Sequence, residues 1–200
     1  MMRSFRNREP QIGKDTYVSE YAILIGDVRI GDNCYIGHGA ILRGDYGCIE
    51  IGSGTAVEEG VIMHAPPGET CRVGKKVTIG HGAVVHSSHI GDMAVIGMGS
   101  VLSICAEVGE ESIVAEGSTV KMGQKIPPGI VARGNPAKVV RNVEDKDKKF
   151  WGWGKQLYID LAKEYLQRNT SRRTGNRHTN ISYQAVSTLE NLRVRGVRSG

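Results

Sequence analysis

Histidines are the side chains in this sequence best suited to chemistry, because four of the six lie within one short stretch. They are His64, His81, His86 and His89. Neutral imidazole is a common ligand for zinc and related transition metals, and three imidazoles leave a bound ion doubly positive, so that it can activate a water. A metal site is therefore the hypothesis to test, and its geometry depends on the elements that carry the histidines.

A six-residue repeat determines where these histidines lie. Neither an α-helix, with about 3.6 residues per turn, nor an alternating strand, with a period of two, has this spacing. The register slips by three residues after Leu42 and breaks over residues 65–76. Aliphatic residues occupy the repeated position at Ile12, Val18, Leu24, Ile30, Ile36, Leu42, Ile51, Val57, Met63, Ile79, Val85, Ile90, Ile96, Leu102, Val108, Val114, Val120 and Ile126.

This period predicts an all-β solenoid. Six residues suit a short extended segment plus a corner, with the aliphatic side chain pointing into a shared core. Three such units close one triangular coil of about 18 residues, and successive coils pair in parallel about 4.8 Å apart. Residues 12–131 would then form roughly six to seven coils. Glycine often follows the aliphatic residue, as in Ile30-Gly31, and is expected to supply positive φ at the corners.

The repeat places three side chains on one edge of the solenoid. Arg43, His64 and His86 each follow a core residue, and the intervals between them are one coil plus the slip and one coil plus a loop insertion. They should therefore stack, with the two histidines about 4.8 Å apart at the backbone. His81 lies one side of the triangle before His86, too far away to bind the same ion within one chain.

A neighbouring subunit could supply His81, which predicts a homotrimer with one metal at each interface. The alternative is that all these histidines are solvated surface residues.

The remaining segments suggest three parts to the chain. Residues 1–140 are assigned to the solenoid, 141–167 to a segment containing a helix over 146–167, and 168–200 to a basic, poorly ordered tail. The helix is expected to pack on the solenoid of its own or a neighbouring subunit through Trp153, Leu157, Leu161 and Tyr165.

The net charge of +5 arises in the tail, which holds seven arginines and one glutamate. The tail lacks aromatic interleaving and any nucleic-acid-binding signature, so no nucleic-acid partner is expected. An apolar leader core and a run of membrane-spanning length are both absent from the sequence, which favours a cytoplasmic protein without a membrane partner. The four scattered cysteines suit reduced thiols.

Several motifs together resemble one known family. They are Ile-Leu-Arg-Gly-Asp at residues 41–45, Met63-His64, Ile79-Gly80-His81 with His86, and His89-Ile90-Gly91-Asp92 followed by Ile96-Gly97-Met98-Gly99. This set resembles the γ-class carbonic anhydrases and relatives labelled transferase-like or phenylacetate- and carnitine-operon proteins. The resemblance covers residues 10–167, and it implies a left-handed parallel β-helix of hexapeptide repeats.

The resemblance also implies a function and a site. His64 and His86, with His81 from the adjacent subunit, would bind Zn²⁺, with Fe²⁺ or Co²⁺ as alternatives. In that family the metal activates a water to attack CO₂, giving reversible hydration to bicarbonate. The family's Arg and Asp, implicated in site organisation and subunit contact, fall on Arg43 and Asp45.

One segment departs from the family's pattern. Residues 56–60 read Ala-Val-Glu-Glu-Gly where the family usually has Asn-Val-Gln-Asp-Gly. Glu58 could accept a proton from the water, bind the metal or repel bicarbonate. It follows Val57 much as His81 follows Ile79, so it is expected beside the His81 of its own subunit. The loop at 65–76 also lacks the acidic run that serves as a proton shuttle in the family.

Three other functions stay open at this point. The same metal and a base at Glu58 could hydrolyse an acyl-CoA thioester. A hexapeptide acyltransferase could use one histidine as base without metal. A catalytically silent trimer could use the metal only to hold its subunits together.

Overall fold

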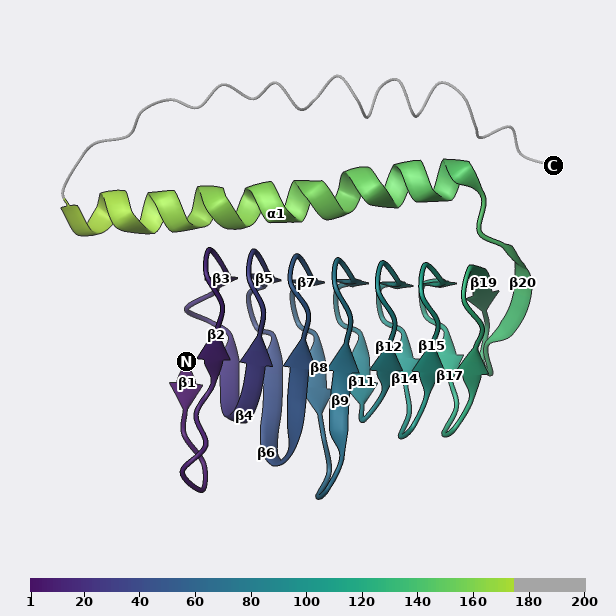
Figure 1. Cartoon of the computed structure of the whole chain (residues 1–200), viewed down its shortest axis with the longest axis horizontal. Helices are drawn as coiled ribbons and strands as arrows, with labels where there is room; N and C mark the ends of the chain where they lie inside the picture. Colours follow the sequence, from purple (N-terminus) through teal and green to yellow (C-terminus); the bar gives the residue numbers. More distant parts are fainter. Residues whose placement is uncertain (175–200) are drawn as a thin grey trace. The chain divides into compact units, whose positions relative to one another are not determined.

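The computed structural model of the protein describes residues 1–174, with side chains up to residue 168. Residues 1–167 form one compact unit, which contains a parallel β-solenoid and the helix α1 up to residue 167 (Figure 1). The helix α1 as a whole spans Asp145–Thr174. This architecture confirms the predicted solenoid with a C-terminal helix. The helix ends seven residues beyond the predicted 167, and the part of the predicted tail from residue 175 onward lies outside the described residues.

One face of the solenoid is formed by seven parallel strands stacked in order, one for each coil. The last of them pairs antiparallel with β20 (Lys138–Asn142). We call this the helix face, because α1 packs on it. Its strands are β3 (Tyr17–Val18), β5 (Tyr35–Ile36), β7 (Ala56–Val57), β10 (Thr78–Ile79), β13 (Val95–Ile96), β16 (Ile113–Val114) and β19 (Ile130–Arg133).

The second face carries a row of aliphatic side chains that point away from the core, and we call it the aliphatic face. The row is in register from coil to coil and consists of Ile23, Ile41, Ile62, Val84 and Val101. Ile62 is 45% exposed and Val101 is 36% exposed. The strands are the first halves of β4 (Ile23–Ile30) and β6 (Ile41–Ile51), then β8 (Ile62–His64), β11 (Val84–His86), β14 (Val101–Leu102) and β17 (Thr119–Val120).

The third face carries polar and charged residues at the corresponding positions, and we call it the charged face. Its outward row is Gln11, Arg29, Glu50, Arg72, His89, Glu107 and Lys125. The strands are β2 (Gln11–Ile12), the second halves of β4 and β6, β9 (Thr70–Val73), β12 (His89–Ile90), β15 (Glu107–Val108) and β18 (Lys125–Ile126). The short β1 (Met2–Arg3) pairs with β4.

The core consists of the repeated aliphatic residues, as the period predicts. Leu24, Leu42, Met63 and Leu102 are fully buried. Burial of each such side chain is worth about 1.5–3 kcal/mol, so the stacked rows supply much of the driving force for folding. Because every residue in a row pairs with its equivalent one coil away, the register of the whole solenoid follows from the repeat.

The glycines that follow the core residues have a different cause from the one expected. Positive φ occurs about two positions later, for example at Gly39 and Gly60. At Gly31 a Cβ would lie 2.7 Å from the backbone nitrogen of Ser53, and at Gly80 it would lie 2.8 Å from that of Met98. The next coil approaches too closely for a side chain at these positions, so close packing of the coils, and not φ, requires glycine there.

The repeat also continues where the sequence suggested a break. Residues 65–76 were expected to form a loop, but β9 lies inside this segment, and Cys71 and Val73 are buried in the core. Val73 lies six residues before Ile79, so it keeps the register. The irregular part is limited to the few residues around Pro66 and Gly68.

Helix α1 packs on its own solenoid, with a contact stripe different from the predicted one. Leu161 and Tyr165 do pack against the helix face, but Leu157 is 42% exposed. The buried stripe instead includes Lys155 and Ala162, which are 4% and 0% exposed. The surface of the helix face accounts for this different stripe. Beneath α1 it presents two tyrosine rings and one small side chain, those of Tyr17, Tyr35 and Ala56.

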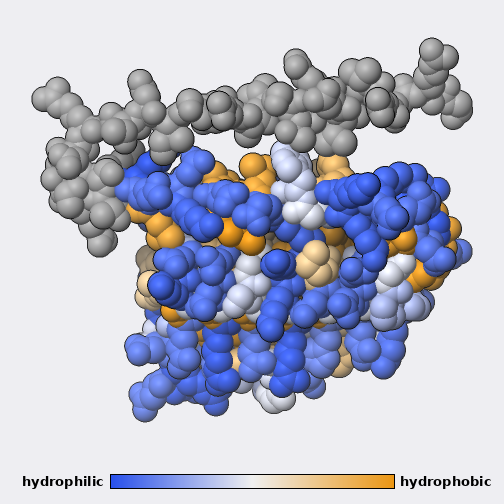
Figure 2. Space-filling view, turned by 45° about the horizontal axis from the view of Figure 1, so that its top comes forward, coloured by the Kyte–Doolittle hydropathy of each residue, from blue (hydrophilic) through white to orange (hydrophobic). Residues whose placement is uncertain are grey.

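Aromatic stacking fixes the helix against the solenoid. The ring of Tyr165 stacks on that of Tyr17 at 4.5 Å between centroids, and Tyr158 lies 5.2 Å from Tyr35. Figure 2 shows hydrophobic residues along α1 above a largely hydrophilic solenoid surface. Over its described length, α1 is not apolar enough to cross a membrane.

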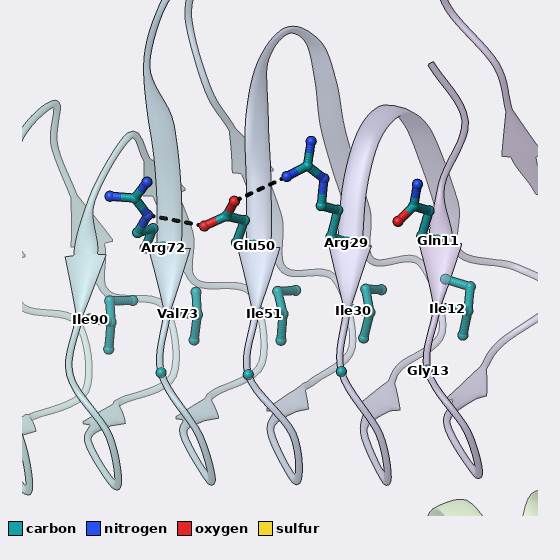
Figure 3. Close-up of a pocket in the computed structure, with 13 residues that line it drawn as sticks. Gln11, Ile12, Gly13, Arg29, Ile30, Glu50, Ile51, Arg72, Val73 and Ile90 are labelled. Carbon is teal, nitrogen blue, oxygen red and sulfur yellow. Dashed lines mark hydrogen bonds and ion pairs between the residues drawn. The ribbon is translucent and has the colours of Figure 1, made fainter. Parts of the chain in front are cut away.

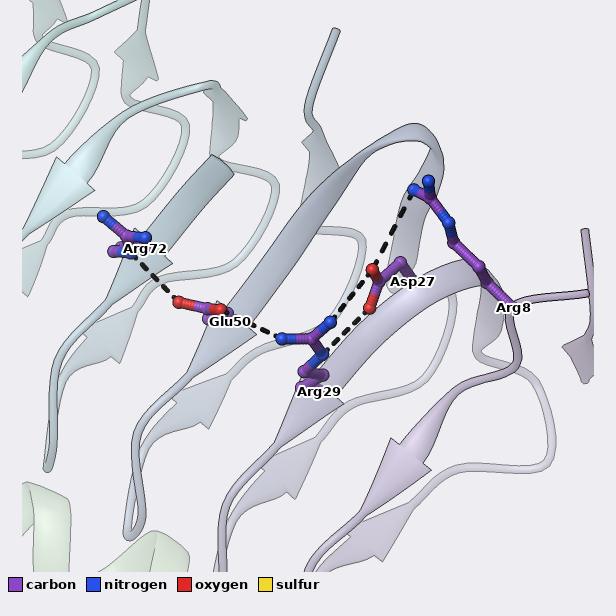
Figure 4. A network of polar contacts seen from close by, with 5 residues as sticks. All are labelled: Arg8, Asp27, Arg29, Glu50 and Arg72. Carbon is purple, nitrogen blue, oxygen red and sulfur yellow. Dashed lines mark hydrogen bonds and ion pairs between the residues drawn. The ribbon is translucent and has the colours of Figure 1, made fainter. Parts of the chain in front are cut away.

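A ladder of ion pairs crosses the coils of the charged face (Figure 4). Glu50 lies 3.4 Å from Arg29 and 3.0 Å from Arg72, while Asp27 lies 3.0 Å from Arg29. The arginine side chains are more than half exposed, so each pair is worth about 0–1 kcal/mol. Arg8 also lies 3.9 Å from Asp27, so three arginines share two carboxylates in this network.

A groove of about 630 Å³ runs beside this ladder, over the edges of core residues such as Ile30 and Ile51 (Figure 3). None of the three candidate ligand histidines lines it. Glycines at the corners, which have no side chains, line part of this groove. The candidate metal centre lies elsewhere, at the histidines.

Candidate metal centre

The structure stacks Arg43, His64 and His86 on one edge of the aliphatic face. Arg43 pairs with His64 in register, and His64 pairs with His86. Each follows a core residue, and His64 and His86 end their strands while Arg43 lies within β6. The three side chains point out of the solenoid at the corner between the aliphatic and charged faces. The predicted stacking is confirmed.

The two imidazoles of this edge face each other. His64 Nδ1 lies 2.9 Å from His86 Nε2. Two nitrogen ligands of a tetrahedral zinc ion, each about 2.0–2.1 Å from it, would lie about 3.3 Å apart. The two rings therefore need only a small separation to share an ion.

His64 also has an unused nitrogen. Its Nε2 is buried without a hydrogen-bond partner, and the nearest carboxylate oxygen, on Asp45, is 3.7 Å away. Burial lowers the pKa of His64, and the charges of Arg43 and His86 lower it further. The neutral imidazole that results is the form that binds metals.

Arg43 and Asp45 form an ion pair within one chain. One guanidinium nitrogen of Arg43, Nη1, contacts both carboxylate oxygens of Asp45, at 2.9 and 3.1 Å. Burial would raise the pKa of Asp45, but the hydrogen bond and charge of Arg43 outweigh it, so the pKa is lowered. The pair places an anion beside His64, where it can orient that ring.

His81 lies at the other edge of the same face. It follows β10 of the helix face and precedes β11 of the aliphatic face, while His86 ends β11. Its side chain is 46% exposed. Among the residues that the structure describes, no three metal-binding side chains gather around one point within the chain. This separation agrees with the expectation that His81 could complete a site only in a neighbouring subunit.

Glu58 and Glu59 hold His81 in place. Nε2 of His81 lies 3.1 Å from Glu58, and Nδ1 lies 2.9 Å from Glu59. The backbone nitrogen of His81 also donates to Glu58, at 3.1 Å. Both ring nitrogens of His81 therefore contact a carboxylate in the single chain, so one of these two contacts would have to open before His81 could bind a metal, with the other carboxylate left to orient the ring.

The register behind these contacts differs from the one inferred from the sequence. Val57 pairs with Ile79, so Glu58 stacks on Gly80, and Glu59 is the residue that stacks on His81. Glu58 reaches His81 because its side chain turns along the edge. Its pKa is raised by burial, against the opposing influence of His81 and of a hydrogen bond from Tyr158.

Sequence reasoning did not find Lys155, which α1 buries against the helix face. Lys155 is buried and donates from Nζ to Thr78 Oγ1 at 3.2 Å and to the carbonyl of Ala94 at 3.0 Å. Burial lowers the pKa of Lys155 to about 8, and the nearby Glu58 charge opposes the shift. Spacings of three and four from Lys155 through Tyr158 to Ala162 were the available signal.

The lowered pKa of Lys155 makes stability depend on pH. Between about pH 8 and its ordinary value of 10.5, the unfolded chain holds a proton that the folded chain has released. The free energy of unfolding should therefore rise with pH there, relative to a Lys155→Met variant, by up to about 1.4 kcal/mol per pH unit. Urea unfolding of both proteins at several pH values measures the difference; parallel curves would contradict it.

The fold and the stacked edge define a hexapeptide-repeat solenoid protein, and comparisons with known proteins agree. A family model described as bacterial transferase hexapeptide (six repeats) matches residues 9–44. The chain is 42% identical over 159 residues to the carnitine operon protein CaiE of Escherichia coli K12, across 80% of this chain and 81% of that protein.

One further relative and one solved structure indicate which family of hexapeptide-repeat proteins this is. Gamma carbonic anhydrase 2, mitochondrial, of Arabidopsis thaliana is 35% identical over 170 residues, across 82% of this chain, which spans 61% of the plant protein. The solved structure of a hexapeptide transferase family protein from Anaplasma phagocytophilum matches with a TM-score of 0.79 and 32% identity, across 82% of this chain and 98% of that one. The chain therefore belongs to the γ-carbonic-anhydrase-like family of left-handed β-helix proteins.

Proposed function

We propose that this protein is a homotrimeric, metal-dependent enzyme that catalyses the reversible hydration of CO₂ to bicarbonate. Each metal would be bound by His64 and His86 of one subunit and by His81 of the next. Zinc is the expected metal, with Fe²⁺ or Co²⁺ as alternatives. One observation supports the proposal most directly. His64 and His86 lie on one edge of the exposed aliphatic face, and His81 lies on the opposite edge of the same face.

The three faces explain why this one would join subunits. The helix face is covered by α1, and the charged face carries ion-paired polar side chains in place of an aliphatic row. The aliphatic face leaves Ile62 and Val101 exposed in the single chain. Burying such a row against a second copy is favourable at about 25 cal/mol per Å².

Three-fold symmetry then completes the site. If three aliphatic faces turn toward a common axis, the edge with His64 and His86 meets the next subunit's edge with His81. Such a head-to-tail contact closes into a ring, so each trimer would contain three equivalent sites.

The chemistry assigned to the chain's own residues follows from their contacts. A divalent metal bound by three neutral imidazoles supplies an activated water near neutral pH. Glu58, which already contacts His81, would accept the proton that this water loses. Asp45 and Arg43 would orient His64 from the other edge, and Glu59 would orient His81.

The function is tested on protein purified without oxygen, by measuring its metal content and its CO₂ hydration rate in the same sample. The proposal expects about one metal per subunit and a rate that disappears with a chelator and returns with the metal. A metal-loaded trimer without CO₂ hydration would contradict the activity. In that case, thioester hydrolysis of acyl-CoA is the next assay, because the buried carboxylate of Glu58 suits a hydrolytic base.

Glu58→Gln provides a direct test of the base. The substitution keeps the shape and restores the amide usual in the family, but it removes the proton acceptor. We expect CO₂ hydration to fall by about a hundredfold, because general-base catalysis contributes about 10²–10⁴. Metal content should stay unchanged. Glu107→Gln on the charged face is the matched control, and an unaltered pH–rate profile in Glu58→Gln would exclude a role for this carboxylate in catalysis.

A further inference from the structure

The edge of the aliphatic face that carries His81 continues for two coils beyond it. Strands β10, β13 and β16 are paired in register, so the second residue after each strand forms a column, which consists of His81, Met98 and Glu116. Backbone hydrogen bonds from Gly99 to His81 and from Gly117 to Met98 join these corners. Glu116 is therefore the equivalent of His81 two coils further along the solenoid.

The opposite edge of the face continues in the same way beyond His86. Strands β11, β14 and β17 are paired in register at their core residues, and the residues that follow these core residues are His86, Ser103 and Lys121. Lys121 is therefore the equivalent of His86 two coils further on. Glu116 precedes β17 and Lys121 follows it, so the two charges have the same arrangement as the two histidines.

Both charges are available for an external partner. Glu116 and Lys121 are exposed, and neither forms an ion pair with any residue that the structure describes. They lie on opposite edges of one face, so they do not meet within one chain. On the charged face, by contrast, the exposed Lys125 pairs with Glu107 of its own chain at 2.9 Å.

The proposed trimer would bring the two charges together. Rotation about an axis parallel to the solenoid places each coil of one subunit beside the same coil of the next. The rotation that brings His81 to the partner subunit's His86 therefore also brings Glu116 to the partner subunit's Lys121, about 10 Å further along the solenoid. The coil between these two levels adds Met98, which is 51% exposed, to the apolar part of the contact.

We propose that Glu116 of one subunit forms an ion pair with Lys121 of the next, and that this pair sets the level at which the two edges meet. Opposite charges across an interface fix its register. A slip of one coil would separate this pair, and it would also move His81 away from His86. The inference rests on the trimer of the proposed function, but the ion pair itself can be measured without metal.

Charge reversal tests the pair. Glu116→Lys and Lys121→Glu each place like charges at all three interfaces, so each should raise the concentration at which half of the trimer dissociates about tenfold or more. The double variant restores an opposite pair at every interface, and its assembly should return close to that of the wild type. Analytical ultracentrifugation of the four full-length proteins measures this, after chelation and again with zinc.

Glu107→Lys and Lys125→Glu are the matched controls, because they reverse the same charges on the charged face, and they should leave assembly unchanged. Single reversals without effect would overturn the proposal, as would a double variant no better assembled than the single ones. Recovery of the trimer in the double variant of a chain that binds no zinc would support the ion pair and refute the proposed metal function. A wild type that is monomeric with and without zinc would overturn both.

Discussion

Replacing His64, His81 or His86 by alanine should lower bound metal from about one ion per subunit to below about a tenth. Each site would lose one of three imidazoles, and two ligands hold a zinc ion far less tightly than three. Because the ion would bridge two subunits, its loss should also loosen the trimer. Metal analysis after gel filtration, together with the mass of the eluted species, measures both effects.

His89→Ala is the matched control for this series. His89 is exposed on the charged face, away from both edges of the site, so its removal should leave metal content and mass unchanged. Full metal content in the His81→Ala variant would mean that the third ligand lies elsewhere, and the interface geometry would then be wrong.

Ile62→Glu should convert the trimer into monomers. Ile62 lies in the middle of the aliphatic row, next to Met63 and His64, and is 45% exposed in the single chain. In the proposed trimer a carboxylate at this position would be buried without a partner, which costs several kcal/mol at each interface. Analytical ultracentrifugation at micromolar concentration measures the change. Bound metal should be lost in parallel.

The control for this substitution is His89→Glu, at the corresponding position of the charged face, which should remain trimeric. The solenoid itself should survive in both variants, because neither side chain belongs to the core. A trimer that persists in Ile62→Glu with full metal content would show that another face joins the subunits.

The six-residue period was sufficient to predict the fold and half of the site. Core residues such as Leu42, Met63 and Val85 stack because each coil repeats the one before, so Arg43, His64 and His86 stack with them. This inference needs only the spacing of aliphatic residues, which a sequence shows directly. The three-residue slip and the loop insertion change the coil length without moving the register of the core.

The contacts around Glu58 could not be predicted in the same way. They depend on which side of α1 meets the solenoid, and the apolar residues of the helix, including Leu157, suggested a different side. A buried lysine contradicts the usual burial preference, so no sequence pattern places Lys155 in this contact. Val57 pairs with Ile79, but Glu58 is one residue after Val57 and His81 is two residues after Ile79, so the two differ by one position in register.

The shared site is tested most directly by mixing two defective subunits. One carries His81→Ala and the other carries His64→Ala with His86→Ala, so neither alone can build a three-histidine site. In a co-expressed one-to-one mixture that assembles at random, about a quarter of the interfaces would join an intact His64–His86 edge to an intact His81 edge. We expect the mixture to bind about a quarter of the wild-type metal, while each variant alone binds almost none. A mixture that binds no more metal than its separate components would contradict a metal site shared between subunits.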